Sequence, residues 1–440
     1  MKSMIISSNC SGGGKTTVTL ALMGNLIKRG YDVQGYKVGP DYIDSAFHGK
    51  VTGKPSRNLD IFLMGTEGVK ESYLNGNGNL GVIEGVMALY DGKGLDTEFS
   101  TAHVARTLDL PVVLVMTPKA QSVTLCAEIK GLLEFENVNI VGVILNNVTE
   151  SYYKLLKAGI ELNCSGVKVF GYVPNDSRIS LESRHLGLVQ SSEVEDLLDK
   201  IEIASELIEE HVDMDSLIEE FKEAEVIKED KKYRLENKNL KIAVAYDEAF
   251  SFYYKENLEL LEQMGDIYYF SPLCDEKLPE NIDFLYIGGG YPEVYKEKLT
   301  KNKSMLDSIY NALDSGVKCY AECGGLMYLT KEIDGCKMVG FLDGKSMMTK
   351  KLNNFGYGQV EVAMENNILP RGLKVNCHEF HKSIVELKEQ TIYKVRKELY
   401  DGSIKEWDCG YAKKNTLAAY AHIHFFSNLE FIKSLLKCSK

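Results

Sequence analysis

The chain has 440 residues, a length that predicts two or three domains. Its 51 Lys and Arg residues stand against 63 Asp and Glu residues, and the net charge of −12 argues against a basic face for nucleic acid or a membrane surface. The sequence has no apolar run of about 18 residues that would predict a membrane span. The 10 cysteines form no CxxC pair, which argues against zinc and redox motifs. We expect a cytoplasmic protein without a disulfide framework or a signal peptide.

Short apolar runs alternate with helical patterns over residues 1–190, the first predicted domain. The predicted buried strands are Ser3–Ser7, Asp32–Val38, Gly81–Glu84, Pro111–Met116 and Ile140–Asn146. This alternation is typical of βαβ units and predicts a mostly parallel sheet.

A glycine-rich sequence follows the first predicted strand and precedes a helical pattern. It reads Asn9-Cys10-Ser11-Gly12-Gly13-Gly14-Lys15-Thr16-Thr17 and fits the phosphate-loop pattern G-x-x-x-x-G-K-[ST], with Asn9 in place of the first glycine. Backbone N–H groups at a helix start bind phosphates, Lys15 would neutralise their charge, and Thr16 would bind Mg²⁺. We expect a nucleotide site formed by Ser11, Gly12, Gly13, Gly14, Lys15, Thr16 and Thr17.

Acidic residues follow two of the predicted strands. Asp41 and Glu84 each come after an apolar run, and ligands of parallel sheets lie beyond the carboxyl ends of the strands. Because Mg²⁺ on a nucleotide needs one or two carboxylates, we predict metal ligation by Thr16, Asp41 and Glu84. Asp44 and Asp91 lie three and seven residues further along and are candidates for positioning a substrate.

The second half of the chain restarts the strand pattern after an acidic segment. Residues 191–238 have apolar residues at helical spacing among many charges, which predicts a solvated helical linker. Further strands are predicted at Leu240–Ala245, Asp283–Ile287, Val317–Ala321, Tyr357–Val362 and Thr416–His422. Residues 239–440 are therefore predicted to form a second α/β domain.

A cysteine stands where one of these strands meets a helical pattern. The order of strand Val317–Ala321, turn Glu322-Cys323-Gly324-Gly325 and helix predicts a nucleophile elbow. We expect the helix N-terminus to lower the pKa of the Cys323 thiol. The Gly324 N–H and the glycine loop around Gly289 would donate to an oxyanion.

Two histidines near the C-terminus are candidates for the base that a cysteine nucleophile requires. His422 and His424 stand at i and i+2 of a predicted strand and would point to one face. We predict His422 as the base, with His424 as the alternative. His378 and His381 form another polar cluster, for which we expect a substrate or interface loop.

Nine segments resemble, in the same order, the cobyrinic acid a,c-diamide synthases over nearly the whole chain. They are SGGGKTTVTLALM, YKVGPDYIDSAFH, GKPSRNLD, EGVMALYDG, IGGGYPEVY, AECGGLMYL, GYGQVEV, HEFHKS and AYAHIHF. The resemblance implies an α/β fold with a P-loop, dethiobiotin synthetase-like parallel-sheet domain. It also implies a class I glutamine amidotransferase-like α/β domain after the linker.

The resemblance also implies a reaction. Cys323 would release ammonia from glutamine, and the ammonia would pass through an internal channel. ATP, with Mg²⁺ as cofactor, would phosphorylate the c and then the a acetate carboxylate of a corrinoid tetrapyrrole, and ammonia would displace the phosphate. Tyr42, Asp44 and Asp91 would lie near this substrate.

The sequence departs from the usual amidotransferase pattern at one position. A glutamate usually stands two residues after the catalytic histidine, whereas His424 stands there after His422, and Phe426 after His424. The pattern therefore predicts a Cys–His dyad.

Several alternatives remain open at this point. The same reaction on nickel-sirohydrochlorin or hydrogenobyrinic acid fits the same motifs, and a homo-oligomer is compatible with the sequence. Cobyric acid synthase has both domains but matches the segments less well. A P-loop switch ATPase would lack glutaminase activity and would not need Cys323.

Overall fold

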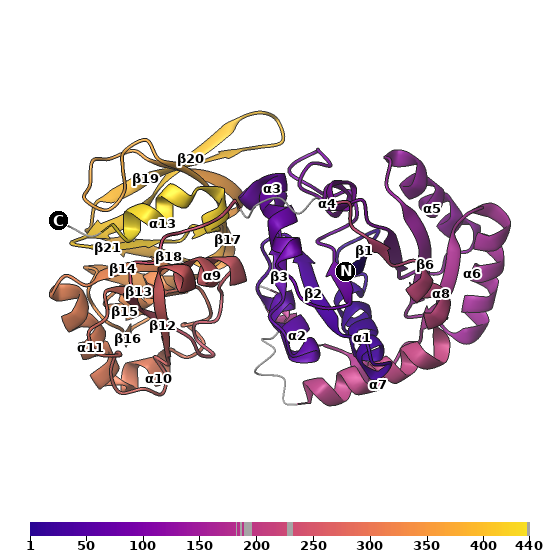
Figure 1. Ribbon diagram of the computed structural model, residues 1–440, viewed down its shortest axis with the longest axis horizontal. Helices are drawn as coiled ribbons and strands as arrows, with labels where there is room; N and C mark the ends of the chain where they lie inside the picture. Colours follow the sequence, from indigo (N-terminus) through magenta and orange to yellow (C-terminus); the bar gives the residue numbers. More distant parts are fainter. Residues whose placement is uncertain (182, 185–186, 189–195, 227–231, 438–440) are drawn as a thin grey trace. The chain divides into compact units, whose positions relative to one another are not determined.

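A computed structural model describes residues 1–181, 183–184, 187–188, 196–226 and 232–437 (Figure 1). The chain forms two compact units, of which the first comprises Met1–Ile61 with Thr66–Asp230 and the second comprises Phe62–Gly65 with Lys231–Lys440. Within the described residues, none of the helices has the length and apolar character needed to cross a membrane.

The first unit is built on an eight-stranded sheet with the order β3-β2-β4-β1-β5-β6-β7 and with β10 beside β1. The bounds are β1 Lys2–Ser8, β2 Val33–Val38, β3 Arg57–Leu59, β4 Leu80–Glu84, β5 Val112–Met116, β6 Ile140–Asn146, β7 Lys168–Val173 and β10 Lys222–Glu223. Every pair along the path is parallel, and only β10 runs antiparallel to its neighbour. The five strands predicted here are confirmed, and so is the parallel sheet.

Helices follow the strands of this unit in the βαβ manner. They are α1 Lys15–Lys28, α2 Ile43–Thr52, α3 Ile61–Leu74, α4 Thr101–Leu108, α5 Val123–Phe135, α6 Glu150–Asn163, α7 Leu197–His211 and α8 Met214–Glu219, with a 3-10 turn at Ser177–Ile179 and a small pair of strands, β8 Ser183–Arg184 and β9 Gly187–Leu188. The register of the central strands aligns Lys37 of β2 and Ile6 of β1 with Glu84 of β4. Two charged residues thus meet at the carboxyl edge of the sheet.

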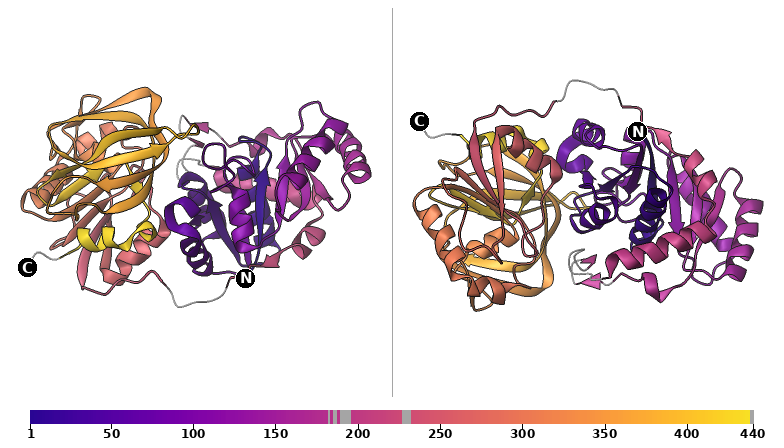
Figure 2. Two further views of the ribbon diagram at one scale, coloured as in Figure 1. Left: turned by 90° about the horizontal axis from the view of Figure 1, so that it is seen from above. Right: turned by 60° about the horizontal axis from the view of Figure 1, so that its bottom comes forward.

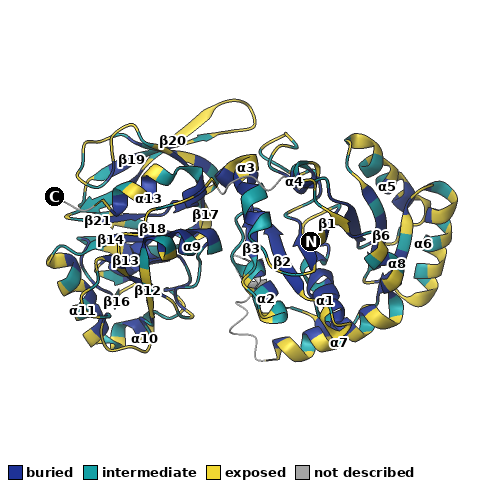
Figure 3. Cartoon of the chain, in the orientation of Figure 1, coloured by how far each residue is buried: buried dark blue, intermediate teal, exposed yellow. Residues whose placement is uncertain are grey.

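The acidic segment does not form a solvated linker where the structure describes it. Helix α7 lies beside α1 (Figures 1 and 2), and Ala204 and Ile208 join the apolar core of the first unit. A Cβ at Gly24 of α1 would come within 2.3 Å of the Ser205 hydroxyl oxygen, so a larger residue there would have to displace the Ser205 side chain. Figure 3 shows that only one side of α7 is exposed. The many charges of this helix lie on that outer side, while its apolar stripe is buried.

The second unit contains a twelve-stranded sheet that is parallel in one half and mainly antiparallel in the other. Its path is β12-β11-β13-β14-β21-β20-β19-β17-β15-β16, and β18 pairs with β17 and β22. The bounds are β11 Leu240–Ala245, β12 Gly265–Phe270, β13 Phe284–Ile287, β14 Lys318–Glu322, β15 Glu332–Ile333, β16 Cys336–Lys337, β17 Gly344–Val362, β18 Lys374–Leu387, β19 Thr391–Glu398, β20 Ile404–Lys413, β21 Thr416–Ala419 and β22 His422–Ile423. The parallel strands β11, β13 and β14 confirm three predictions, whereas β18, β19 and β20 were not predicted.

The helices of the second unit include the short one that begins after β14. They are α9 Lys255–Met264, α10 Lys296–Lys301, α11 Lys303–Asp314, α12 Gly324–Leu329 and α13 Leu429–Leu435, with a 3-10 turn at Phe425–Ser427. The strand predicted over Thr416–His422 is interrupted: β21 ends at Ala419 and pairs with β14 and β20, while β22 pairs with β18. His424 lies beyond β22 and caps the 3-10 turn, so the two histidines are not on one continuous strand.

Candidate active sites

The phosphate loop of the first unit connects β1 to α1. Gly14 has φ of 83°, and a Cβ there would lie 2.2 Å from the Asn146 side-chain nitrogen. A Cβ at Gly13 would lie 2.4 Å from the Ser8 hydroxyl oxygen, so both positions accept only glycine without rearrangement. The Lys15 ammonium donates to the Cys10 carbonyl over 3.3 Å and thus curls back over the loop. This arrangement is that of a phosphate cradle at a helix N-terminus.

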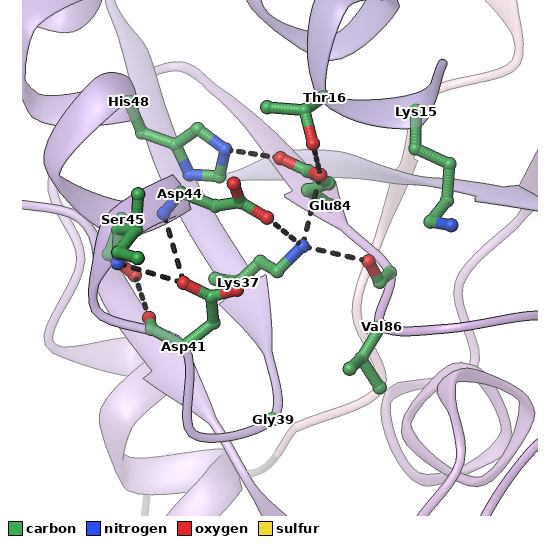
Figure 4. Close-up of polar contacts among 12 residues, drawn as sticks. Lys15, Thr16, Lys37, Gly39, Asp41, Asp44, Ser45, His48, Glu84 and Val86 are labelled. Atoms are coloured by element: carbon green, nitrogen blue, oxygen red, sulfur yellow. Dashed lines mark hydrogen bonds and ion pairs between the residues drawn. The ribbon is translucent and has the colours of Figure 1, made fainter. Parts of the chain in front are cut away.

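A network of buried charges lies below the loop (Figure 4). The Thr16 hydroxyl donates to Glu84 Oε1 over 2.6 Å, and Lys37 Nζ lies 3.0 Å from the same oxygen. Lys37 also pairs with Asp44 Oδ2 at 2.6 Å, and His48 Nε2 lies 2.7 Å from Glu84 Oε2. Both carboxylate oxygens of Glu84 therefore have partners, and the network ties α1, α2, β2 and β4 together.

The pKa values of this network follow from burial and charge. Burial disfavours ionised Glu84, but Lys37, His48 and Thr16 outweigh it and lower the pKa of Glu84. Burial likewise opposes the Lys37 ammonium, yet the neighbouring carboxylates raise its pKa. Burial, followed by the charge of Lys37, lowers the pKa of Lys15. Burial raises the pKa of Asp44 well above its ordinary value.

The other predicted residues of this unit have different surroundings. Asp41 Oδ1 accepts the N–H groups of Ile43 and Asp44 at 2.8 and 3.0 Å, which caps α2. Tyr42 is the residue before the first turn of that helix. Asp91 is exposed in the segment after β4, where it accepts the Ala88 N–H at 3.4 Å. The structure therefore brings Asp44 into the charge network with Thr16 and Glu84. Asp91 contacts Ala88 instead and, among the described residues, lies outside that network.

The nucleophile elbow of the second unit has the geometry that its sequence predicts. Cys323 joins β14 to α12 with φ of 49°, an uncommon value for a residue with a side chain. Its N–H donates to the Ala419 carbonyl of β21 over 2.7 Å. The glycine loop after β13 meets the elbow, because the Gly325 N–H donates to Gly288 O over 3.1 Å. A Cβ at Gly324 would lie 3.1 Å from the Gly290 nitrogen, so the two predicted oxyanion segments are adjacent.

The expectation of a lowered thiol pKa is wrong for this structure. Burial raises the pKa of Cys323, and the carboxylates of Glu293 and Glu379 raise it further, whereas the Gly324 N–H opposes them. Helix α12, which begins after Cys323, has only six residues. The thiol is therefore protonated at neutral pH, and a base has to accept its proton during attack.

The two candidate histidines face different carboxylates. His422 Nδ1 lies 3.6 Å from Glu322 Oε2, and Glu322 is the residue just before Cys323. His424 Nε2 lies 3.5 Å from Glu256 Oε2 of α9, and His424 Nδ1 accepts the Phe426 N–H over 3.2 Å. His422 is thus associated with the elbow strand, and His424 with a helix and a turn.

The remaining polar cluster lies on β18. His378 stacks on His422 with ring centroids 4.9 Å apart, and burial lowers the pKa of His378 well below its ordinary value. His381 Nε2 lies 3.1 Å from Glu379 Oε2, and its ring is parallel to that of Tyr420 at 3.7 Å. In the part of the chain that the structure describes, no three His, Cys, Asp or Glu side chains form a metal group.

Sequence reasoning missed three residues that the fold brings to these sites. Lys37 and His48 hold Glu84, and Glu322 faces His422. A charged residue inside an apolar run is the available signal, since Lys37 and Glu322 both stand in strands that are otherwise buried. His48 has no such signal, because it lies in α2, outside the apolar runs of the predicted strands.

Comparison with known proteins matches both halves of the chain to known domains. Residues 4–189 match the CobQ/CobB/MinD/ParA nucleotide binding domain, and residues 241–430 match the CobB/CobQ-like glutamine amidotransferase domain. A cobyrinate a,c-diamide synthase of Clostridium tetani (strain Massachusetts / E88) is 63% identical over 441 residues, which cover 99% of this chain and 100% of the relative.

Two further relatives carry the same name. The protein of Clostridium acetobutylicum is 62% identical over 439 residues, with 99% of this chain and 100% of the relative covered. The protein of Caldanaerobacter subterraneus subsp. tengcongensis is 43% identical over 448 residues, with 99% and 98% covered. By this identity along its whole length, the chain belongs to the cobyrinate a,c-diamide synthase family.

Proposed function

We propose that this protein uses ATP and glutamine to amidate the a and c acetate carboxylates of cobyrinic acid. The observation that carries the proposal is one chain with a phosphate cradle at Gly13 and Gly14 and a cysteine elbow at Cys323. The names of relatives 62–63% identical over 99% of the chain support this substrate and the role in cobalamin biosynthesis. By its family the protein is a glutamine-hydrolysing amidoligase.

We assign the glutamine step to the second unit. As His422 takes the thiol proton, Cys323 Sγ attacks the side-chain amide carbon, and the oxyanion is held by backbone N–H groups of Gly324 and Gly289. The C–N bond then breaks, His422 returns the proton to the leaving nitrogen, and ammonia departs from a glutamyl thioester. Water hydrolyses the thioester to glutamate and restores the thiol.

We assign the ATP step to the first unit. Ser11–Thr17 would bind the phosphates, with Lys15 against the negative charge. The Thr16 hydroxyl and the Glu84 carboxylate are oxygen donors side by side, which suits Mg²⁺, and Asp41 would have to release its cap to join them. A substrate carboxylate attacks the γ-phosphate, the bond to the β-phosphate breaks, ADP leaves, and an acyl phosphate forms. Ammonia then displaces phosphate and leaves the amide, with Tyr42, Asp44 and Asp91 toward the substrate.

Mass spectrometry of the reaction tests this proposal. The protein would be incubated with ATP, Mg²⁺ and glutamine, and with cobyrinic acid, hydrogenobyrinic acid or nickel-sirohydrochlorin in separate reactions. Two successive mass steps that match replacement of OH by NH₂ on cobyrinic acid are expected. If the two mass steps occur on another tetrapyrrole but not on cobyrinic acid, the substrate must be reassigned. ATP turnover without any amide product would contradict the proposed ligase activity.

Cys323→Ala separates the two steps. This variant should lose glutamine-dependent amidation, while free ammonia should restore product because the ATP step does not need the thiol. Loss with both nitrogen donors would contradict the nucleophile role. Glutaminase activity of the wild-type protein also excludes a switch ATPase.

A further inference from the structure

The carboxylate nearest the base candidate comes from an unexpected place in the chain. Glu322 Oε2 lies 3.6 Å from His422 Nδ1, and both side chains are nearly inaccessible, at 1% and 3% exposure. Glu322 is the last residue of β14, so the strand end that presents Cys323 also presents this carboxylate. The residue two positions after His422, where amidotransferases usually have glutamate, is His424.

Two hydrogen bonds hold the Glu322 carboxylate in place. Its Oε1 accepts the Ile423 N–H over 3.1 Å, and its Oε2 accepts the Tyr286 hydroxyl over 3.1 Å. In the β14–β21 register Glu322 is opposite Ala419, whose carbonyl also accepts the Cys323 N–H. Buried hydrogen bonds of this kind fix the orientation of a carboxylate.

The His422 ring is fixed on its other sides. A Cβ at Gly289 would lie 2.6 Å from His422 Cε1 and 3.4 Å from Nε2, so this edge faces the glycine loop that abuts the elbow. His378 covers one face of the ring, with an angle of 25° between the planes, and is itself 3.3 Å from the Tyr254 hydroxyl. Nδ1 thus faces Glu322, while Nε2 faces the loop beside Cys323.

We propose that Glu322 is the positioning residue for His422 and takes the place of the missing glutamate in a Cys–His–Glu triad. A carboxylate at Nδ1 keeps the hydrogen on that nitrogen, which leaves the Nε2 lone pair to accept the thiol proton. When the C–S bond forms and the proton moves from Cys323 Sγ to Nε2, the resulting imidazolium faces a negative charge. This inference rests on the proposed roles of Cys323 and His422.

The test compares Glu322→Gln with a matched variant, Glu256→Gln. Both carboxylates are buried and face one histidine each, at 3.6 and 3.5 Å. An amide at position 322 would donate to Nδ1 and favour the wrong tautomer. We expect Glu322→Gln to lower the glutaminase kcat by about 10²- to 10⁴-fold. The KM for glutamine should stay within about threefold, because ground-state binding is unchanged.

Two controls separate positioning from a structural role. Ammonia-dependent amidation should be unchanged in Glu322→Gln, and Glu322→Asp should recover part of the glutaminase rate because it restores the negative charge. Glu256→Gln should keep its glutaminase rate within about twofold of wild type.

Three results would overturn the proposal. They are an unchanged glutaminase kcat in Glu322→Gln, a parallel loss of ammonia-dependent amidation in that variant, and a collapse of glutaminase in Glu256→Gln instead, which would assign the base to His424. Failure of the proposed function is distinguishable, because it would show as glutaminase activity retained in Cys323→Ala.

Discussion

The Thr16 hydroxyl donates a 2.6 Å hydrogen bond to Glu84, and this contact joins the first turn of α1 to the end of β4. The two residues are 68 positions apart in the chain. The same carboxylate pairs with the ammonium of Lys37 and faces His48. The Glu84 side chain that supports the phosphate loop is therefore held in place by these partners. A binding loop supported in this way needs little reorganisation when an anion arrives.

Glu84→Gln should damage both stability and catalysis. It removes the charge that compensates buried Lys37, and breaking such a pair costs about 3–5 kcal/mol. Urea unfolding measures the free energy of unfolding. The amidation rate of this variant should be lower than that of the wild type, whether glutamine or free ammonia supplies the nitrogen. Glu67→Gln removes an exposed partner of Lys70 and should change the unfolding free energy by about 0.5 kcal/mol or less. Equal effects of the two substitutions would contradict a buried network.

Lys15→Ala should strongly slow the ATP step while leaving glutaminase intact. The ammonium is the loop cation nearest the expected phosphates, and loss of one such contact lowers kcat by about 10²- to 10³-fold. Amidation measured with ammonia isolates this effect from the glutamine step. Lys28→Ala, at the far end of the same helix, removes only exposed pairs with Glu202 and Glu206 and should be close to wild type. Normal amidation by Lys15→Ala would remove the loop from the mechanism.

Alkylation of Cys323 should depend steeply on pH. Its pKa is raised by burial and by Glu293 and Glu379, so the thiolate fraction below the ordinary thiol value near 9 is small and grows with pH. The labelling rate with iodoacetamide, followed on the Cys323 peptide by mass spectrometry, should rise about tenfold per unit between pH 7 and 9. A rate that is already constant over this range would show a thiolate at rest and would restore the lowered pKa expected from the sequence.

Shortening a buried side chain of the acidic helix α7 should destabilise the first unit. Ile208 is fully buried, and Ile208→Ala should lower the free energy of unfolding by about 2–5 kcal/mol. Leu198 lies on the outer side of the same helix with 63% exposure, so Leu198→Ala should cost about 0.5 kcal/mol or less. Indistinguishable denaturation curves for the two variants would support the solvated linker instead.

The sequence by itself was sufficient for features encoded by neighbouring residues. The glycine loop at Gly12–Thr16, the elbow at Cys323 and most of the parallel strands follow from patterns a few residues long, although β3, β7 and β12 were not predicted. Such patterns determine local backbone geometry directly, because glycine positions and alternation of apolar residues act within one turn or strand.

The tertiary structure decided which distant residues meet. The parallel register of β2 and β4 brings Lys37 to Glu84, and α7 buries Ile208 although its segment reads as solvated. The break between β21 and β22 turns His422 toward Glu322 and His424 toward Glu256. These contacts depend on sheet order and strand register, which are set by burial of the whole core. A local pattern can mark a charged residue inside a strand, but it does not specify which distant residue will be its partner.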